Sequence, residues 1–348
     1  MSSNTVYVIG AGASFEVNLP TGNELKTHIS NILNMALDPT FGHFKGGNGE
    51  LYQSLKTHST DTKSELTLYL QACKHIRANM PLAISIDNFI DSQRNNDAVA
   101  LCGKIGIVNA ILKAERDSKL YFHGSAMPQR IQFSKLEGTW YLPFFRTLTE
   151  NCVVEDLKDR FSKVTLIIFN YDRCIEHFLY HALKTYYLLD DEKALEVINE
   201  LEIIHPYGTV GALRWQEKNS STVVDFGGEI NWRDYINYAQ RIRTFTEETH
   251  SEIDLAINKK MEKARKLVFL GFAFHRLNMK ILSKSKSLRY QAMHTVKCYA
   301  TAYESSSSDR EAIYNEIRHL YEYEPIIKIE DMTCSNLFKN YSRSLGFG

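Results

Sequence analysis

Four segments of this chain contain residue types that could take part in chemistry, and each stands directly after an apolar run. In chain order they are Gly10-Ala11-Gly12-Ala13-Ser14, Asn170-Tyr171-Asp172, His205-Pro206-Tyr207-Gly208 and Gly271-Phe272. In open parallel sheets, ligands bind beyond the carboxyl ends of the strands. If the four runs are strands of one such sheet, the segments meet in a single site.

The first segment has the composition of a phosphate-binding turn. A glycine-rich turn between a strand and a helix presents backbone N–H groups to an anion, so we expect it to contact a dinucleotide. The residues concerned are Gly10, Ala11, Gly12 and Ser14. The usual Gly-x-Gly-x-x-Gly fingerprint is incomplete, because position 15 is phenylalanine. A tight strand-to-helix turn without a ligand is the alternative interpretation.

Asn170 and His205 are the candidates for catalysis. An amide can hydrogen-bond a sugar hydroxyl or a water, and an imidazole with its ordinary pKa of ~6.5 accepts a proton near neutral pH. Both have structural alternatives. Asn170 or Asp172 can cap the following helix, and His205 can be a hydrogen-bonded structural histidine. We expect Asp172 to orient the loop while Asn170 faces the cleft.

Two further places are less specific. Gly271 before Phe272 suits the close approach of a ribose or phosphate to the backbone, although a plain loop glycine is the alternative. Asp87, in Ser85-Ile86-Asp87-Asn88-Phe89, stands at the start of a predicted helix. We interpret Asp87 as an N-terminal cap.

Six apolar runs predict the strands that position these segments. Their lengths fit strands buried on both faces, as in parallel sheets covered by helices. The runs are Val6–Ile9, Val164–Phe169, Leu201–Ile204, Leu267–Leu270, Val296–Ala300 and Ile326–Ile329.

Helical patterns alternate with these runs. Thr21 and Glu24 form a capping box ahead of an apolar helix face. Apolar side chains from Ile175 to Leu183 repeat at helical spacing, and the segment from Arg310 to Tyr321 is amphipathic. The alternation predicts an α/β fold with a Rossmann-like, doubly wound parallel sheet.

A long interval separates the first two predicted strands. It opens with a glycine-rich loop from Phe41 to Gly49 and then has mainly helical patterns, as in Glu65–Ala78 and Asn96–Arg116. We therefore expect a helical insertion over residues 40–150, within a nucleotide-binding domain formed by residues 1–39 and 151–348.

Composition excludes several classes of protein. Lysine plus arginine total 41 and aspartate plus glutamate total 41, so the chain lacks the basic excess typical of proteins that coat nucleic acids. The six cysteines form no Cys-x-x-Cys pair, so we expect no zinc or other metal site. No stretch approaches the ~18 apolar residues of a membrane span, and no signal peptide is recognisable. We expect a soluble, cytoplasmic protein with no membrane contact.

The four segments resemble the sirtuin family, and more closely the sirtuin-like NAD hydrolases of bacterial antiphage defence. Gly10 to Ser14 looks like the family's Gly-Ala-Gly-x-Ser loop. Phe169-Asn170-Tyr171-Asp172 resembles its Thr-x-Asn-x-Asp segment, in the Phe-Asn-Tyr-Asp form of the defence branch. His205 matches the catalytic histidine, and Gly271-Phe272 matches the later strand-end glycine that contacts the cofactor.

Two features depart from the family pattern. The zinc ribbon of the sirtuin deacylases, with its two Cys-x-x-Cys pairs, is missing. The family's adjacent His-Gly is spread into His205-Pro206-Tyr207-Gly208.

The resemblance implies an NAD glycohydrolase that gives nicotinamide and ADP-ribose, with NAD as substrate, and that depletes NAD in abortive infection. Asn170 and His205 would be catalytic; Gly10, Ala11, Gly12, Ser14, Asp172, Gly271 and Phe272 would bind the dinucleotide. It also implies a homo-oligomer and a partner such as a HerA-type ATPase. An ADP-ribosyltransferase or deacylase, and a non-catalytic NAD or ADP-ribose sensor, are the alternatives.

Overall fold

The computed structural model describes residues 4–37, 44–59, 63–123, 130–217, 221–244, 251–283, 289–292 and 294–347. A six-stranded, all-parallel sheet with the order β5-β4-β1-β6-β7-β8 forms its centre. The strands are β1 (Thr5–Ile9), β4 (Val164–Ile168), β5 (Glu202–Ile204), β6 (Lys266–Leu270), β7 (Lys297–Thr301) and β8 (Ile326–Glu330). The prediction of an α/β fold with a Rossmann-like parallel sheet is confirmed, and each strand overlaps its apolar run.

Alternate side chains of the central strands enter two separate cores. In β1, Val6 and Val8 belong to one core, whereas Tyr7 and Ile9 belong to the other. All five residues of β1 and of β4 are buried. A strand buried on both faces has no solvated side, which is why these segments are apolar except for Thr5 and Thr165.

Helices surround the sheet, and one group of them contributes side chains to the first core. These are α2 (Gly22–Ile32), α3 (Gly49–His58), α4 (Lys63–Asn79), α5 (Ile86–Ser92), α6 (Asp97–Arg116), α11 (Tyr235–Ala239), α12 (Ser251–Lys263), α13 (Arg276–Leu282) and α14 (Ser307–Arg318).

The second core lies beneath the other group of helices. These are α1 (Ala11–Phe15), α7 (Tyr141–Thr149), α8 (Leu157–Phe161), α9 (Cys174–Tyr186), α10 (Asp191–Glu200), α15 (Cys334–Asn340) and α16 (Ser342–Leu345). No helix in the described part of the chain combines the length and the apolar character that a bilayer span requires.

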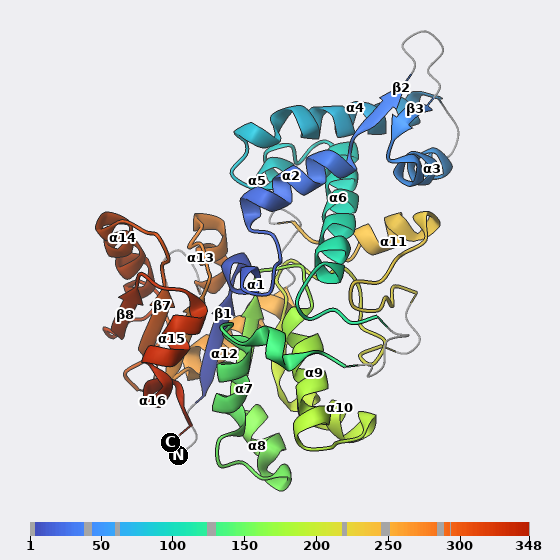
Figure 1. Ribbon diagram of the computed structural model, residues 1–348. Helices are drawn as coiled ribbons and strands as arrows, with labels where there is room; N and C mark the ends of the chain where they lie inside the picture. The colour runs from blue at the N-terminus through green and yellow to red at the C-terminus, as the bar shows by residue number, and fades with distance from the viewer. Residues whose placement is uncertain are drawn as a thin grey trace.

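A layer of helices lies beyond the carboxyl ends of the strands, at the end of the sheet where α1 follows β1 (Figure 1). The long helix α6 is its centre and packs against α2, α4, α5 and α11. Two glycines allow close packing there. A Cβ on Gly103 would lie 2.7 Å from the Ile90 side chain, and one on Gly106 would lie 2.9 Å from the Ile29 side chain. Glycine inside a helix costs up to about 1 kcal/mol relative to alanine, and this close packing explains the choice.

The elements between β1 and β4 do not pack as one unit. Helix α2, which precedes residue 40, packs on α6 and α4, whereas α7 packs on α9 and α15 across the sheet. The expectation of a glycine-rich loop is wrong for Phe44–Gly47, which forms strand β3 and pairs antiparallel with β2 (Met35–Leu37). Residues 41–43 lie outside the described part of the chain. The capping box at α2 is confirmed, since Thr21 accepts from the Glu24 N–H and Glu24 accepts from the Thr21 N–H.

Candidate functional site

The order in which successive strands are added to the sheet reverses between β1 and β6. Strands β4 and β5 continue from β1 on one side, and β7 and β8 continue from β6 on the other. Crevices at such switch points are where open α/β sheets bind ligands. Gly10 and Gly271 stand at the carboxyl ends of the two strands, so two of the predicted segments meet at this point.

Gly10 and Gly271 pack backbone against backbone. The Gly12 N–H donates to the Gly271 carbonyl at 3.0 Å, and the Gly10 N–H donates to the Leu270 carbonyl at 3.0 Å. A Cβ on Gly10 would lie 2.5 Å from the Gly271 oxygen. Gly271 itself has φ +53°, and a Cβ there would overlap the backbone nitrogen of Ala13. The glycines therefore have a packing function of their own, and the Gly12 N–H is engaged by Gly271 rather than free for a phosphate.

Ser14, Asn170 and Asp172 form one hydrogen-bonded network. The Asn170 amide Nδ2 donates to Ser14 Oγ at 3.1 Å, and Ser14 Oγ donates to Asp172 Oδ2 at 3.0 Å. All three residues are buried. Asp172 Oδ1 also accepts from the Cys174 N–H at 3.1 Å, a contact within the loop; the N-cap of α9 is Arg173, so neither Asn170 nor Asp172 takes the cap position. The ends of β1 and β4 are thereby joined through side chains.

His205 joins the end of β5 to the same network. Its Nδ1 lies 3.2 Å from the Asn170 carbonyl oxygen, and its Nε2 lies 2.7 Å from Oε1 of Glu176 in the first turn of α9. The His205 side chain is 11% exposed and that of Glu176 is 3% exposed. Both ring nitrogens are thus engaged, so His205 can accept a proton from a ligand only after one of these contacts opens. Glu176 was not among the residues predicted from the sequence.

The turn after His205 explains the spread His-x-x-Gly pattern. The Gly208 N–H donates to the His205 carbonyl at 3.1 Å, which closes a four-residue turn. Gly208 has φ +72°, and a Cβ there would overlap the Arg241 carbonyl oxygen. Glycine is needed at this position for the chain to turn away from the sheet while His205 stays at the strand end.

Electrostatics in the network raise the pKa of two groups, His205 and Asp172. Burial alone would lower the pKa of His205, but the charge and the hydrogen bond of Glu176, together with the Asn170 carbonyl and the charge of Asp172, outweigh it, so that the pKa lies above its usual value. Burial raises the pKa of Asp172, against the lowering by the Cys174 N–H, and the nearby charges of Glu115 and Glu176 raise it further. The site therefore favours a protonated imidazole and disfavours a second carboxylate charge.

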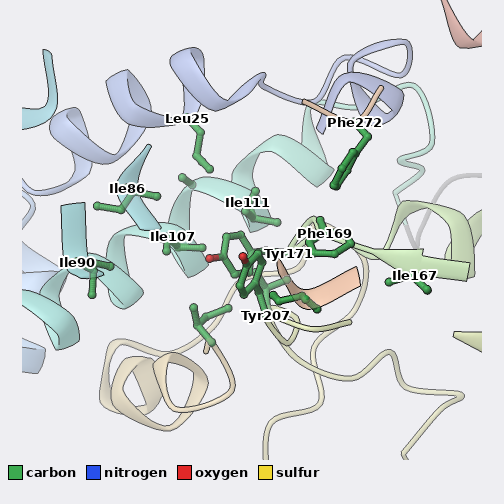
Figure 2. Close-up of a cluster of buried hydrophobic side chains, with 14 of the residues drawn as sticks. Leu25, Ile86, Ile90, Ile107, Ile111, Ile167, Phe169, Tyr171, Tyr207 and Phe272 are labelled. Carbon is green, nitrogen blue, oxygen red and sulfur yellow. The ribbon is translucent and has the colours of Figure 1, made fainter. Parts of the chain in front are cut away.

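Phe272 and Tyr171 point into the core beneath the helical layer (Figure 2). The Phe272 ring packs edge-on against Phe169 at 5.1 Å between centroids, so its side chain has a packing role. Tyr171 donates its hydroxyl to Asp87. The interpretation of Asp87 as the cap of α5 is wrong: Ser85 is the N-cap and accepts from the Asn88 N–H, which leaves Asp87 to bind the loop after β4.

A buried ion pair anchors the residue after Asp172. Arg173 and Glu115 are 1% and 0% exposed, with Nη2 and Oε2 2.5 Å apart. Arg173 also donates to the Val224 carbonyl at 2.7 Å, and Glu115 accepts from the Gly227 N–H at 3.0 Å. The pair fixes the loop after β4 against the end of α6. The sequence carries no local pattern that selects these two residues from the other charged ones.

A cavity of about 410 Å³ lies apart from this network. It opens between α2, α3, the last turns of α6 and the segment from Gly228 to Tyr235, and its lining carries acidic, basic, amide and apolar groups. None of the predicted site residues lines it.

Comparisons with known proteins assign neither a family nor a function to this chain. No protein-family model matches this chain, and no curated protein matches it. Within the described ranges, no three side chains of metal-ligating type form one group.

Proposed function

We propose that this protein is a sirtuin-like NAD hydrolase that breaks the bond between nicotinamide and ribose. The observation that carries the proposal is the convergence of Ser14, Asn170 and His205 through hydrogen bonds at the ends of three adjacent parallel strands. These strand ends are where dinucleotides bind in folds of this class.

NAD supplies a nicotinamide group that already carries positive charge and leaves without an acid. The chain must then orient the ribose and receive one proton from the attacking water or from a ribose hydroxyl. In this proposal Asn170 hydrogen-bonds that oxygen; the contact of its amide with Ser14, which holds the side chain at the strand end, supports this role. His205 is the proton acceptor in this scheme; it acts in the neutral form that it takes above its raised pKa, once its Nε2 contact with Glu176 opens.

The glycine turn supports the proposal less directly. Its close packing with Gly271 positions Ser14 beside Asn170, but it also engages the Gly12 N–H. We therefore assign Gly10, Ala11 and Gly12 to shaping the crevice beside the dinucleotide, and Ser14 to contact with it through the network. Gly271 would lie against the ribose side, and Phe272 would support it from the core.

The test is nicotinamide release from NAD by purified protein. Asn170→Ala and His205→Ala should each lower the rate roughly 100-fold or more, the range lost with a general acid or base. Asn23→Ala and His28→Ala, two exposed positions on α2, are the matched controls and should keep the wild-type rate. Wild-type rates in the Asn170 and His205 variants, with the fold intact by circular dichroism, would refute these roles.

One observation favours a second candidate, a non-catalytic NAD or ADP-ribose sensor. Both nitrogens of His205 are engaged, as in a structural histidine. A sensor would bind NAD or ADP-ribose in a calorimeter and release no nicotinamide over long incubation. Product formation that depends on His205 would exclude it.

The resemblance also supplies proposals about context. We propose that the protein acts in the cytoplasm as a homo-oligomer, with a HerA-type ATPase or another defence protein as partner, and depletes NAD during phage infection. Cellular NAD measured after infection, with wild-type protein and with Asn170→Ala, tests this role. Unchanged NAD in wild-type cells would contradict it.

A further inference from the structure

Glu176 is an acidic side chain buried within the candidate site. Its Oε1 contacts His205, while Oε2 is buried and has no hydrogen-bond partner among the described residues. A buried carboxylate is costly unless it is paired and hydrogen-bonded. The contact with His205 is therefore the interaction that offsets the burial of Glu176.

The hydrogen bonds of His205 fix which nitrogen exchanges a proton. A backbone carbonyl can only accept, so Nδ1 must donate its hydrogen to the Asn170 oxygen in the neutral and the charged ring alike. The proton that comes and goes is then the one on Nε2. That nitrogen faces Glu176 Oε1 at 2.7 Å.

We infer that Glu176 is a positioning residue for His205: the Asn170 carbonyl holds the proton on Nδ1, while Glu176 fixes the other side of the ring and shares the exchangeable proton of Nε2. The inference rests on the proposed function only where His205 serves as the base. A proton taken from water or a ribose hydroxyl would then stay on the His205–Glu176 pair, whose net charge changes from −1 to 0.

Among the described residues, Asp172 is the second charged group that raises the pKa of His205. Asp172, in the loop after β4, raises the pKa of His205 less than Glu176 does. Asp172 is itself bound to Ser14 and to the Cys174 N–H. Glu176 on α9 is the carboxylate in direct contact with the ring, so removing its charge should change the titration of His205 most.

The experiment is a histidine titration by NMR on the full chain. Ring-labelled histidine gives one carbon signal for each residue, and His205→Gln identifies the signal of His205. In the wild type its midpoint should lie above the ordinary ~6.5. Glu176→Gln keeps a hydrogen-bond acceptor but loses the charge, and should lower the midpoint by about 1 to 3 units. The control is Glu196→Gln, which removes an exposed carboxylate on α10 and should leave the midpoint of His205 unchanged.

The outcomes separate this inference from the proposed function. If NAD is hydrolysed, the acidic limb of the pH profile of kcat should move with the NMR midpoint in Glu176→Gln. If the His205 midpoint moves in Glu176→Gln but the wild type does not hydrolyse NAD, the positioning role is retained and the proposed function is refuted. An unmoved midpoint in folded Glu176→Gln would overturn the inference. If that variant does not fold, a wild-type midpoint below ~6.5 overturns it as well.

Discussion

Replacing Arg173 by methionine removes the buried cation that pairs with Glu115. Methionine fills a similar volume, so the main effect is electrostatic. The Glu115 carboxylate, which is 0% exposed, would keep two backbone donors, the N–H of Gly227 and the N–H of residue 173, but would lose its cation. The Val224 carbonyl would also lose its donor.

Breaking a buried ion pair by removing one partner costs about 3–5 kcal/mol, because the remaining charge is buried and uncompensated. The total free energy of unfolding of a domain is about 5–15 kcal/mol. Arg173→Met should therefore remove a large fraction of the stability. The double variant Glu115→Met/Arg173→Met buries no charge, so its cost should be smaller than the sum of the two single costs by up to about 3 kcal/mol.

Urea unfolding followed by circular dichroism measures these costs. Arg214→Met is a matched control, because Arg214 pairs with Asp225 at 2.9 Å but both side chains are well exposed, at 74% and 62%. An exposed pair contributes about 0–1 kcal/mol. If Arg173→Met costs no more than Arg214→Met, or if the two single costs simply add in the double variant, the reasoning about the buried pair is refuted.

Two further stability predictions concern other parts of the fold. Gly138→Ala, at φ +82° with open space around it, should cost about 1 kcal/mol of backbone strain. Gly271→Ala adds overlap with the Ala13 backbone and should cost roughly 2 kcal/mol more in urea unfolding; equal costs would contradict the packing at the switch point. Burial lowers the pKa of His181 to about 4, so the unfolded chain binds more protons below pH ~6.5, and stability should fall as the pH drops from there toward 4. His181→Leu should make this fall shallower in urea midpoints measured across that range, and an identical slope would show that His181 is not the group responsible.

Local sequence patterns were sufficient for most of the sheet and for the identity of the candidate residues. A strand buried on both faces is mainly apolar along its length, so Val6–Ile9 and Val164–Phe169 could be recognised without any knowledge of their neighbours. The capping box of Thr21 and Glu24 is equally local, since its two residues are three positions apart. Polar residues after apolar runs marked Asn170 and His205 for the same reason.

Local patterns misled where a distant contact outweighed them. Glycine is depleted in strands, so the segment at Phe44–Gly47 was expected to be a loop, although pairing with Met35–Leu37 makes it a strand. Asp87 has the residue type of a cap, but Ser85 takes that position, and the hydroxyl of Tyr171 binds Asp87 instead.

The partners within the site were decided by the tertiary structure alone. Strand order brings Gly10 against Gly271, and the placement of α9 beside β5 brings Glu176 against His205. The sequence supplies 41 acidic side chains, and nothing within a few residues of Glu115 or Glu176 shows that these two are buried against a cation or an imidazole. Periodicity and capping depend on neighbours along the chain, whereas the pairing of a buried charge depends on which elements the fold places side by side.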